Sequence, residues 1–399
     1  MNKFAHFIAV TALCTTPTFA KTQEVDPAAL ESLKERQTAV GLRNDVVIME
    51  GASLSKADSD QFEVFNSNIR RVAKRNGFKG AYGFSPGWIT LLGDTKRRYK
   101  AGEKPDLWRW ASVTKQVIAV LVMQEVEQGK IDLDAPLIRY IPEFKSPSAG
   151  KITVRQLLRH QSGLPNPEDS QASSIADSAF YYPSYSGNRD PLVGYCAGRP
   201  KGEPGGNWVY NNCDYMIAGA LLKAVTGKDW QVLVQERILP KLSLQPINLG
   251  AYPTDKPTRK GFIGKRAEPK MKIEHYGASG ALFGSVDDLL YFDRALMNGR
   301  LLGPDAMREL WDGQSDLGFI ALGQWVFTAP LSGCAQPVRI VERRGAIGGV
   351  QVRNFILPDK LTAVVAFTEQ GKFEFGEVWQ GNGFSYDLLS IAACPSKSK

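Results

Sequence analysis

The chain has 399 residues, a formal net charge of +8 and 43% apolar residues, which is typical of a globular protein forming one large domain or two interlocked lobes. Its basic residues are spread along the sequence, and a local group such as residues 70–75 is more typical of a solvated helix face than of a nucleic-acid site. We therefore expect no nucleic-acid partner. No stretch approaches the ~20 consecutive apolar residues of a membrane-spanning helix, so no transmembrane segment is expected either.

Residues 1–20 are predicted to be a secretory signal peptide. Lys3 supplies the positive end, residues 7–13 form a short apolar core, and cleavage is expected after Ala20. Leu13 directly before Cys14 argues against a lipid-modified cysteine. We therefore expect an exported protein, periplasmic or secreted, whose positive charge could favour association with the cell wall.

Cysteine usage agrees with an oxidising compartment. Loss of the signal peptide leaves Cys196, Cys213, Cys334 and Cys394, an even number that suggests disulfides. Chain order suggests the pairs Cys196–Cys213 and Cys334–Cys394, although four cysteines allow three pairings and could also be small buried side chains. With no Cys-x-x-Cys pair and only two histidines after residue 20, a zinc site is not expected.

Helices are predicted mainly in the middle of the chain, and strands at its ends. A hairpin is expected at residues 88–99, turned by Gly93-Asp94, and a second one at residues 350–367. Residues 166–207 lack periodicity, but their aromatic side chains favour an ordered wall over a loose linker. Helices are expected at residues 28–37, 116–126, 214–225, 230–238, 286–297, 304–311 and 385–393. A further helix is expected to begin with a capping box at Thr153 and Gln156 and to be ended by Gly163 and Pro165.

This order favours an α+β fold in which both ends of the chain share one antiparallel sheet and a mostly helical lobe is inserted between them. We expect a single domain over residues 21–399. Its α/β lobe would comprise residues 21–110 and 335–399, and its helical lobe residues 111–334. The helix at residues 116–126 would then lie where the lobes meet, which is a usual place for a pocket.

Ser112 and Lys115 stand at the head of that apolar helix and share one helix face. In a dry environment the pKa of the lysine falls, so the amine can act as a base toward the hydroxyl. This is the Ser-x-x-Lys arrangement of acyl-transferring hydrolases. The same spacing recurs in polar, turn-rich surroundings with no helix behind it, at Ser53/Lys56, Ser148/Lys151 and Ser396/Lys399.

Four other segments accompany this pair in a fixed order: residues 157–165, 204–212, 277–289 and 343–349. Together with Ser112-Val113-Thr114-Lys115 they resemble the serine β-lactamase-related family, which includes class C β-lactamases, DD-peptidases, D-aminopeptidases and esterases. The resemblance extends over residues 80–367. It implies a β-lactamase/transpeptidase-like fold, with an antiparallel sheet flanked by helices.

The resemblance also implies roles for individual residues. Ser112 would be the nucleophile and Lys115 its base. Tyr210 would be a proton shuttle to the leaving group and a partial base, and Asn212 would orient Lys115. A phenol with a pKa near ~10 ionises at neutral pH only beside cations, which Lys115 and Arg343 would supply. The residues around Tyr210 taken alone would equally fit a turn that caps the following helix. His160 is interpreted as a histidine that bonds locally at a helix end, not as a catalytic group.

The segment Arg343-Arg344-Gly345 departs from the family pattern, which usually begins with Lys or His. An arginine keeps its charge and offers a planar fork to a substrate carboxylate, so Arg343, Arg344 and Gly345 are candidate substrate-binding residues. Strand alternation predicts that one of the two arginines points to solvent. By resemblance, the backbone N–H groups of Ser112 and Ala346 would form an oxyanion hole, worth roughly 10²–10³ in rate.

The sequence therefore predicts an exported serine hydrolase that forms an acyl-enzyme at Ser112. We expect a small-molecule or peptide-like substrate, with β-lactams or D-amino-acid peptides ranked ahead of simple esters. The alternative is a protein that is not an enzyme: a catalytically silent fold that binds β-lactams or cell wall. Arg343 supports this alternative, because it departs from the family pattern. No nucleotide loop, metal cluster or flavin motif is recognisable, so no cofactor is expected.

Overall fold

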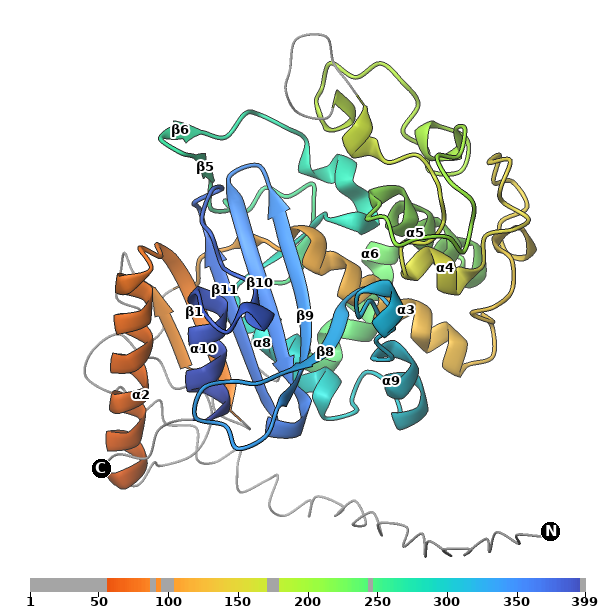
Figure 1. The fold of residues 1–399 in the computed structure, drawn as a ribbon. Coiled ribbons are helices and arrows are strands. Elements are labelled where there is room, and N and C mark those ends of the chain that lie inside the picture. Colours follow the sequence, from red (N-terminus) through yellow and green to blue (C-terminus); the bar gives the residue numbers. More distant parts are fainter. Residues whose placement is uncertain (1–55, 87–90, 95–103, 171–178, 243–246, 395–399) are drawn as a thin grey trace, which may run out of the picture. The chain divides into compact units, whose positions relative to one another are not determined.

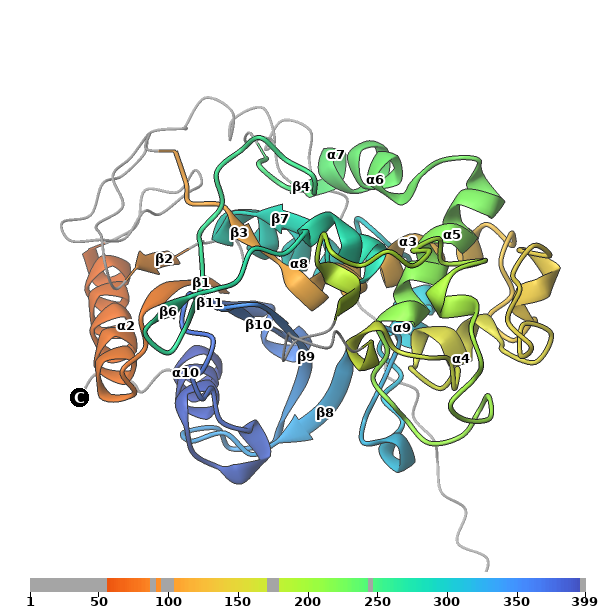
Figure 2. The same ribbon diagram turned by 90° about the horizontal axis from the view of Figure 1, so that it is seen from above.

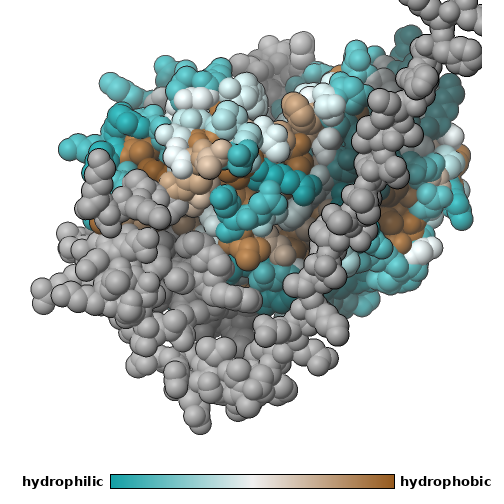
Figure 3. Space-filling view, turned by 60° about the horizontal axis from the view of Figure 1, so that its bottom comes forward, coloured by the Kyte–Doolittle hydropathy of each residue, from teal (hydrophilic) through white to brown (hydrophobic). Residues whose placement is uncertain are grey.

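The computed structural model describes residues 56–86, 91–94, 104–170, 179–242 and 247–394 (Figure 1). The predicted signal peptide, the helix predicted at residues 28–37 and much of the hairpin predicted at residues 88–99 lie outside this part of the chain. Within it, no helix is long and apolar enough to cross a bilayer. On the face drawn in Figure 3, hydrophobic side chains form small patches between hydrophilic ones.

An antiparallel six-stranded sheet organises the fold, in the order β2-β1-β11-β10-β9-β8 (Figure 1). Pairing of β1 with β11 confirms that the two ends of the described chain share one sheet. β11 is buried at every position, as expected of a strand with both faces covered. The strands are β1 (Gly80–Pro86), β2 (Leu91–Asp94), β8 (Trp325–Ala329), β9 (Val338–Ile347), β10 (Val350–Leu357) and β11 (Thr362–Thr368).

The hairpin predicted at residues 350–367 is confirmed, because β10 and β11 pair across the short 3-10 helix Pro358–Lys360. The turn predicted at Gly93-Asp94 is wrong, because both residues belong to β2 and pair with β1. A Cβ on Gly93 would lie 2.3 Å from the ring of Tyr82. The glycine therefore makes room for a cross-strand aromatic ring and does not form a turn.

Helices cover both faces of the sheet (Figure 2). α2 (Lys56–Arg75) and α10 (Phe384–Ala393) pack against each other over one apolar cluster that includes Phe84, Phe355 and Phe384. α8 (Val286–Met297) contacts β1 and β11 on the opposite face. The sheet therefore forms the central layer of a three-layer arrangement.

A second, larger cluster centres on α3 (Thr114–Glu127), which is apolar around most of its circumference and buried at nearly every position. The capping box predicted at Thr153 and Gln156 is present at the start of α4. The other helices are α4 (Val154–Leu158), α5 (Asn212–Thr226), α6 (Trp230–Leu233), α7 (Leu239–Leu242) and α9 (Pro304–Leu310), and short strands lie at β3 (Trp108–Arg109), β4 (Gly250–Ala251), β5 (Phe262–Ile263), β6 (Arg266–Ala267) and β7 (Leu282–Gly284).

The division into two lobes remains a proposal, and the boundary predicted between residues 334 and 335 needs to be moved. β8 belongs to the sheet although it precedes residue 335, and α8 packs on the sheet although it lies within residues 111–334. The second boundary of the inserted lobe therefore falls earlier in the chain than predicted. The reason is that strand pairing and helix packing join residues distant in sequence.

Both predicted disulfides are present, Cys196–Cys213 and Cys334–Cys394. The first joins a 3-10 helix, Tyr195–Ala197, to the first turn of α5. The second joins the end of α10 to the segment between β8 and β9.

The second disulfide closes a loop with a sequence separation of 60 residues, so it should stabilise the fold by limiting the unfolded chain. We expect the double variant Cys334→Ala/Cys394→Ala to lose about 4 kcal/mol of unfolding free energy. Urea denaturation followed by circular dichroism measures this loss. An unchanged unfolding free energy would mean that packing alone holds α10 in place.

Candidate active site

Ser112 lies in a one-turn 3-10 helix, Ala111–Val113, that leads directly into α3. Ala111 has a φ of 46°, a left-handed conformation that is uncommon for a residue with a side chain. Trp110 and Ala111 are fully buried, whereas Ser112 retains some exposure. The strained turn is therefore fixed by its surroundings and presents the serine at the end of a rigid helix.

Lys115 is buried one turn further along, with its Nζ surrounded by oxygen atoms. Nζ lies 3.2 Å from Ser112 Oγ and 2.7 Å from each of Tyr210 Oη, Asn212 Oδ1 and the Ser279 carbonyl. Burial lowers the pKa of Lys115 well below the usual lysine value, and the Arg343 charge lowers it further. The structure therefore favours a neutral amine within reach of the serine hydroxyl.

Tyr210 and Asn212 come from the segment that enters α5, whose N-cap is Asn211. Tyr210 Oη lies 2.6 Å from Ser112 Oγ, so the phenol touches both the serine and Lys115. Burial raises the pKa of Tyr210, although Arg343 and the hydrogen bond to Ser112 oppose the rise. Desolvation thus outweighs the nearby positive charge and disfavours the ionisation of Tyr210 that these cations were expected to allow.

Arg343 lies on β9, on the sheet face toward Ser112, and is almost completely buried. Its Nε donates to the Ser112 carbonyl at 2.9 Å, and its Nη2 lies 3.4 Å from Tyr210 Oη. The guanidinium is also within 5.4 Å of the ring centres of Tyr210 and Trp325. Nη1 has no hydrogen-bond partner among the described residues.

Arg344 is not brought to the same place. Successive residues of a strand point to opposite faces, and Arg344 lies with Glu342 on the face away from Ser112. Its guanidinium forms ion pairs with Glu342 and Glu377. The predicted role of Arg344 in substrate binding is therefore corrected, because the two carboxylates already occupy the donors of its guanidinium.

Gly345 and Ala346 lie where β9 extends past its partner β8, which pairs only with residues up to Glu342. A Cβ on Gly345 would lie 2.6 Å from the Trp110 carbonyl and 3.1 Å from Ser112 N, so only glycine allows this approach. Ile347 and Val350 flank a two-residue hairpin loop and form its hydrogen-bonded pair. The N–H of Ala346 therefore points away from β10, toward the open edge near Ser112.

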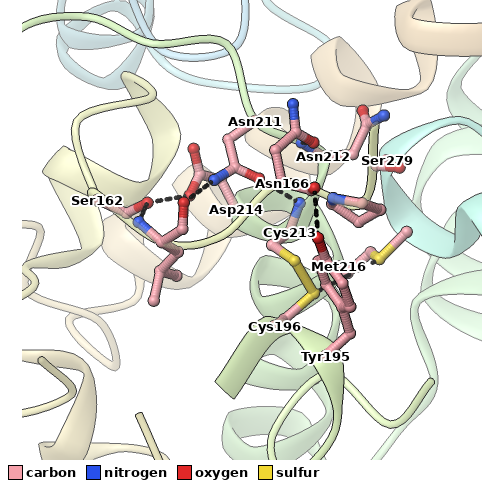
Figure 4. Close-up of a disulfide and its surroundings, with 12 residues drawn as sticks. Ser162, Asn166, Tyr195, Cys196, Asn211, Asn212, Cys213, Asp214, Met216 and Ser279 are labelled. Atoms are coloured by element: carbon pink, nitrogen blue, oxygen red, sulfur yellow. Dashed lines mark hydrogen bonds between the residues drawn. A yellow bond between two sulfur atoms is a disulfide. The ribbon is translucent and has the colours of Figure 1, made fainter. Parts of the chain in front are cut away.

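Several groups around Lys115 were not found from the sequence. Ser279 acts through its backbone carbonyl, which its residue type does not reveal. Glu168 and Tyr181 both accept hydrogen bonds from Asn212 Nδ2, at 2.8 and 2.9 Å, and come from the segment that lacks periodicity. Figure 4 shows Asn166, Asn212 and Ser279 close to the Cys196–Cys213 disulfide.

His160 has a partner that is distant in sequence. Its Nδ1 lies 2.9 Å from Oδ2 of Asp214, which is 54 positions further along the chain, and both side chains are buried. The interpretation of His160 as a locally bonded histidine is therefore wrong. Among the described residues, no group of three or more His, Cys, Asp and Glu side chains is placed to hold a metal ion.

The arrangement brings a hydroxyl, an amine whose lowered pKa favours its neutral form and a phenol into mutual hydrogen-bond contact. A neutral amine can accept the hydroxyl proton as the oxygen attacks an electrophilic carbon. Two backbone N–H groups at the edge of β9 and in the serine turn could stabilise the resulting oxyanion. The geometry is thus suited to acyl transfer.

The contact between Gly345 and the serine turn can be tested by adding one methyl group. We expect Gly345→Ala to displace Ser112 from β9 and to slow its reaction with a fluorophosphonate probe by on the order of 10², the cost of losing an oxyanion donor. Gly150→Ala is the control, because a Cβ there meets open space. Equal labelling rates for Gly345→Ala and the unchanged protein would exclude a role for this contact.

The comparisons with known proteins agree with this geometry. Residues 89–378 match the family model described as Beta-lactamase. The esterase/beta-lactamase LipL of Mycobacterium tuberculosis is 29% identical over 153 residues, covering 38% of this chain and 33% of LipL. An N-acetylmuramyl-L-alanine amidase of Bacillus subtilis is 28% identical over 258 residues, covering 55% of this chain and 56% of the amidase.

Solved structures share the fold. A D-stereospecific amidohydrolase from Streptomyces sp. superposes with a TM-score of 0.64 at 21% identity, covering 83% of this chain and 99% of that one. The D-amino acid amidase from Ochrobactrum anthropi SV3 gives 0.64 at 22% identity, covering 83% and 97%. This chain spans only about a third to just over half of the two curated relatives named above. Because the family model covers well over half of the sequence, the chain belongs to the beta-lactamase family, and the solved structures show that it has the β-lactamase/transpeptidase fold.

Proposed function

We propose that the protein hydrolyses its substrate through an acyl-enzyme on Ser112, with Lys115 as the general base. The observation that carries this proposal is the position of Lys115 Nζ, which is buried, 3.2 Å from Ser112 Oγ and in contact with three other oxygen atoms. Two of these acceptors, Asn212 Oδ1 and the Ser279 carbonyl, orient the amine. Its lone pair is then directed toward the hydroxyl.

The proton can leave Ser112 by either of two short paths. Ser112 can transfer it directly to Lys115, or to Tyr210, which passes its own proton to Lys115 at 2.7 Å. Because Tyr210 remains a protonated phenol, it can donate a proton to the leaving group and recover one from Lys115. Water would then cleave the acyl-enzyme by the reverse sequence of proton transfers.

The backbone N–H groups of Ser112 and Ala346 form the proposed oxyanion hole, and Arg343 the proposed contact with a substrate carboxylate. The unpartnered Nη1 of Arg343 supports the second role, because a buried guanidinium N–H without an acceptor is costly. β-Lactams and peptides that end in a D-amino acid both carry a carboxylate near the scissile amide. We therefore propose β-lactam or D-amino-acid peptide-like substrates.

Carboxylesterase activity is the second candidate. Arg343 is bulkier than the family's usual lysine or histidine and is locked against Tyr210 and the Ser112 carbonyl, which narrows the site toward small acyl groups. The similarity to LipL, which is named an esterase/beta-lactamase, also favours this candidate. A catalytically silent β-lactam- or cell-wall-binding protein is the third, and the contacts between Ser112, Lys115 and Tyr210 argue against it.

We also propose that the protein is exported and periplasmic or secreted. The sequence of residues 1–20 supports this, and so do the two disulfides, which are stable in oxidising compartments. The net charge of +8 would favour contact with anionic cell-wall polymers.

The first experiment compares the unchanged protein with Ser112→Ala during incubation with benzylpenicillin, following protein mass and free drug. We expect only the unchanged protein to gain the mass of the drug or to consume it, because the variant lacks the attacking oxygen. A long-lived adduct would indicate penicillin-binding behaviour, and rapid consumption would indicate a β-lactamase. Turnover by Ser112→Ala would contradict the assignment of the nucleophile. If neither protein reacted with the drug and the unchanged protein alone hydrolysed p-nitrophenyl acetate, the esterase would be favoured.

The pH dependence tests the base. Because Lys115 acts in its neutral form, kcat/KM should rise with pH through the pKa of Lys115 and level off well below the usual lysine pKa. The Lys115→Ala variant should lose roughly 10³ or more in kcat and lack this acid limb. A limb that stays in place in Lys115→Ala would assign it to another group.

A further inference from the structure

His160 holds the residues on both sides of Tyr210. Its carbonyl accepts a hydrogen bond from Val209 N at 3.0 Å, and its Nδ1 accepts one from Asn211 N at 3.3 Å. Its ring lies 4.8 Å from the Tyr210 ring. The backbone of His160 has a φ of 58°, an uncommon conformation that is maintained in the packed interior. His160 is thus placed to position Tyr210 without touching Ser112.

Asp214 lies behind His160, in the first turn of α5. Its Oδ2 is 2.9 Å from His160 Nδ1, and its Oδ1 is paired with the Ser162 hydroxyl. Ser162 Oγ accepts a hydrogen bond from Leu164 N at 3.1 Å, so the hydroxyl hydrogen is free to be donated to Asp214 Oδ1 (Figure 4). No arginine or lysine forms an ion pair with Asp214 in the described structure.

The hydrogen bonds fix where the proton between His160 and Asp214 resides. If Nδ1 carried the proton, Asn211 N–H would face another donor, and an ionised Asp214 would be buried without a cationic partner. If Oδ2 carries it, the single lone pair of Nδ1 is shared by two donors, Asp214 Oδ2 and the more distant Asn211 N, and Ser162 satisfies Oδ1. The second arrangement leaves fewer buried groups unsatisfied.

We propose that Asp214 is a neutral carboxylic acid that donates its proton to His160 Nδ1, and that His160, held as the neutral Nε2–H tautomer, positions Tyr210. In this proposal, no proton is transferred through His160 or Asp214 during hydrolysis. His160 and Asp214 are positioning residues, connected to the reacting atoms only through Tyr210.

The surroundings support this assignment. Burial raises the pKa of Asp214 well above the usual value for an aspartate, and only the Ser162 hydrogen bond and Lys115 oppose the rise. Burial, Arg343 and Lys115 all lower the pKa of His160. The other titratable groups facing the pair are the phenols of Tyr210 and Tyr215. His160 Nε2 has no hydrogen-bond partner in the described residues, so either neutral tautomer leaves this nitrogen unpaired, and an imidazolium would add a buried charge to that cost.

The proposed state also has a consequence for Lys115, which rests on its proposed role as the base. A buried negative charge at Asp214 would raise the pKa of Lys115 and favour the inactive ammonium. A neutral acid at this position gives the same hydrogen bonds without that charge. The pair can therefore support Tyr210 while leaving the lysine amine free to accept a proton.

The direct test is ¹⁵N nuclear magnetic resonance of the histidine rings, which requires no turnover. The variant His275→Gln removes the only other histidine of the described chain. We expect His160 to remain a neutral Nε2–H tautomer from about pH 5 to about pH 9, across the range where an ordinary histidine titrates. An Nδ1–H tautomer or an imidazolium in this range would overturn the proposal.

The second test compares Asp214→Asn with Asp214→Ala by the pH dependence of kcat/KM. An asparagine amide can donate to Nδ1 and accept from Ser162, so we expect Asp214→Asn to keep most of kcat and the position of the acid limb. Asp214→Ala should lower kcat by about tenfold or more, with a smaller change in KM, because Tyr210 loses its support. If Asp214→Asn moved the acid limb to lower pH, Asp214 would carry a charge and the proposal would fail.

Asp293→Asn is the matched control, because Asp293 is a buried aspartate on α8 that is hydrogen bonded to Asn354 and is outside the site. If Asp214→Ala does not fold, Asp214→Asn and the resonance experiment still decide the question. A protein that hydrolysed none of the acyl substrates would contradict the proposed function, while the histidine tautomer would still report on Asp214.

Discussion

The burial of the Lys115 amine is the constraint on which the rest of the structure depends. An ammonium removed from water is destabilised by several kcal/mol unless it is paired, and the neutral form is favoured instead. The chain accepts this cost by surrounding Nζ with four oxygen atoms, from the serine turn before α3, the segment that enters α5 and the turn before β7. Each of these elements is itself fixed by apolar packing around α3. The site is therefore precise because three segments distant in sequence meet at one nitrogen atom.

Arg343 occupies the position where the family pattern usually has a lysine or a histidine, and it differs from both in its permanent charge. If a lysine stood at this position, either it or Lys115 could lose its proton, so that only one buried charge would remain. An arginine keeps its charge. The permanent charge of Arg343 therefore acts on Lys115, whose pKa it lowers, and on Tyr210, whose anionic form it favours without overcoming desolvation. The guanidinium also ties β9 to the serine turn through the Ser112 carbonyl. Arg343 thus contributes both to the electrostatics of the site and to the attachment of the serine turn to β9.

The irregular segment after α4 supports the site from the outside. Tyr195 Oη donates to the Asn166 carbonyl, while the Asn166 side chain donates to the Tyr210 carbonyl and accepts from Asn212 N. The Cys196–Cys213 disulfide joins the same segment to α5 next to Asn212 (Figure 4). Phe180, Tyr181 and Tyr182 are buried, as expected for an ordered wall. A stretch without helical or strand periodicity therefore gains its order from side-chain hydrogen bonds and a covalent link.

The sequence by itself determined the features that depend on local chemistry or on order along the chain. These include the Ser112–Lys115 pair on an apolar helix, the capping box at Thr153, the two disulfides and the sharing of one sheet by both ends of the chain. Only the tertiary structure decided that Arg343 faces the serine while Arg344 is paired with two glutamates. It also decided that the Ser279 carbonyl contacts Lys115 and that Glu168 contacts Asn212. The contact between His160 and Asp214 likewise depends on it. The physical reason is that strand direction, desolvation and hydrogen-bond pairing across long stretches of chain are set by packing. The same desolvation raises the pKa of Tyr210 although a cation lies beside it, and a charge-based argument from sequence does not include this loss of water.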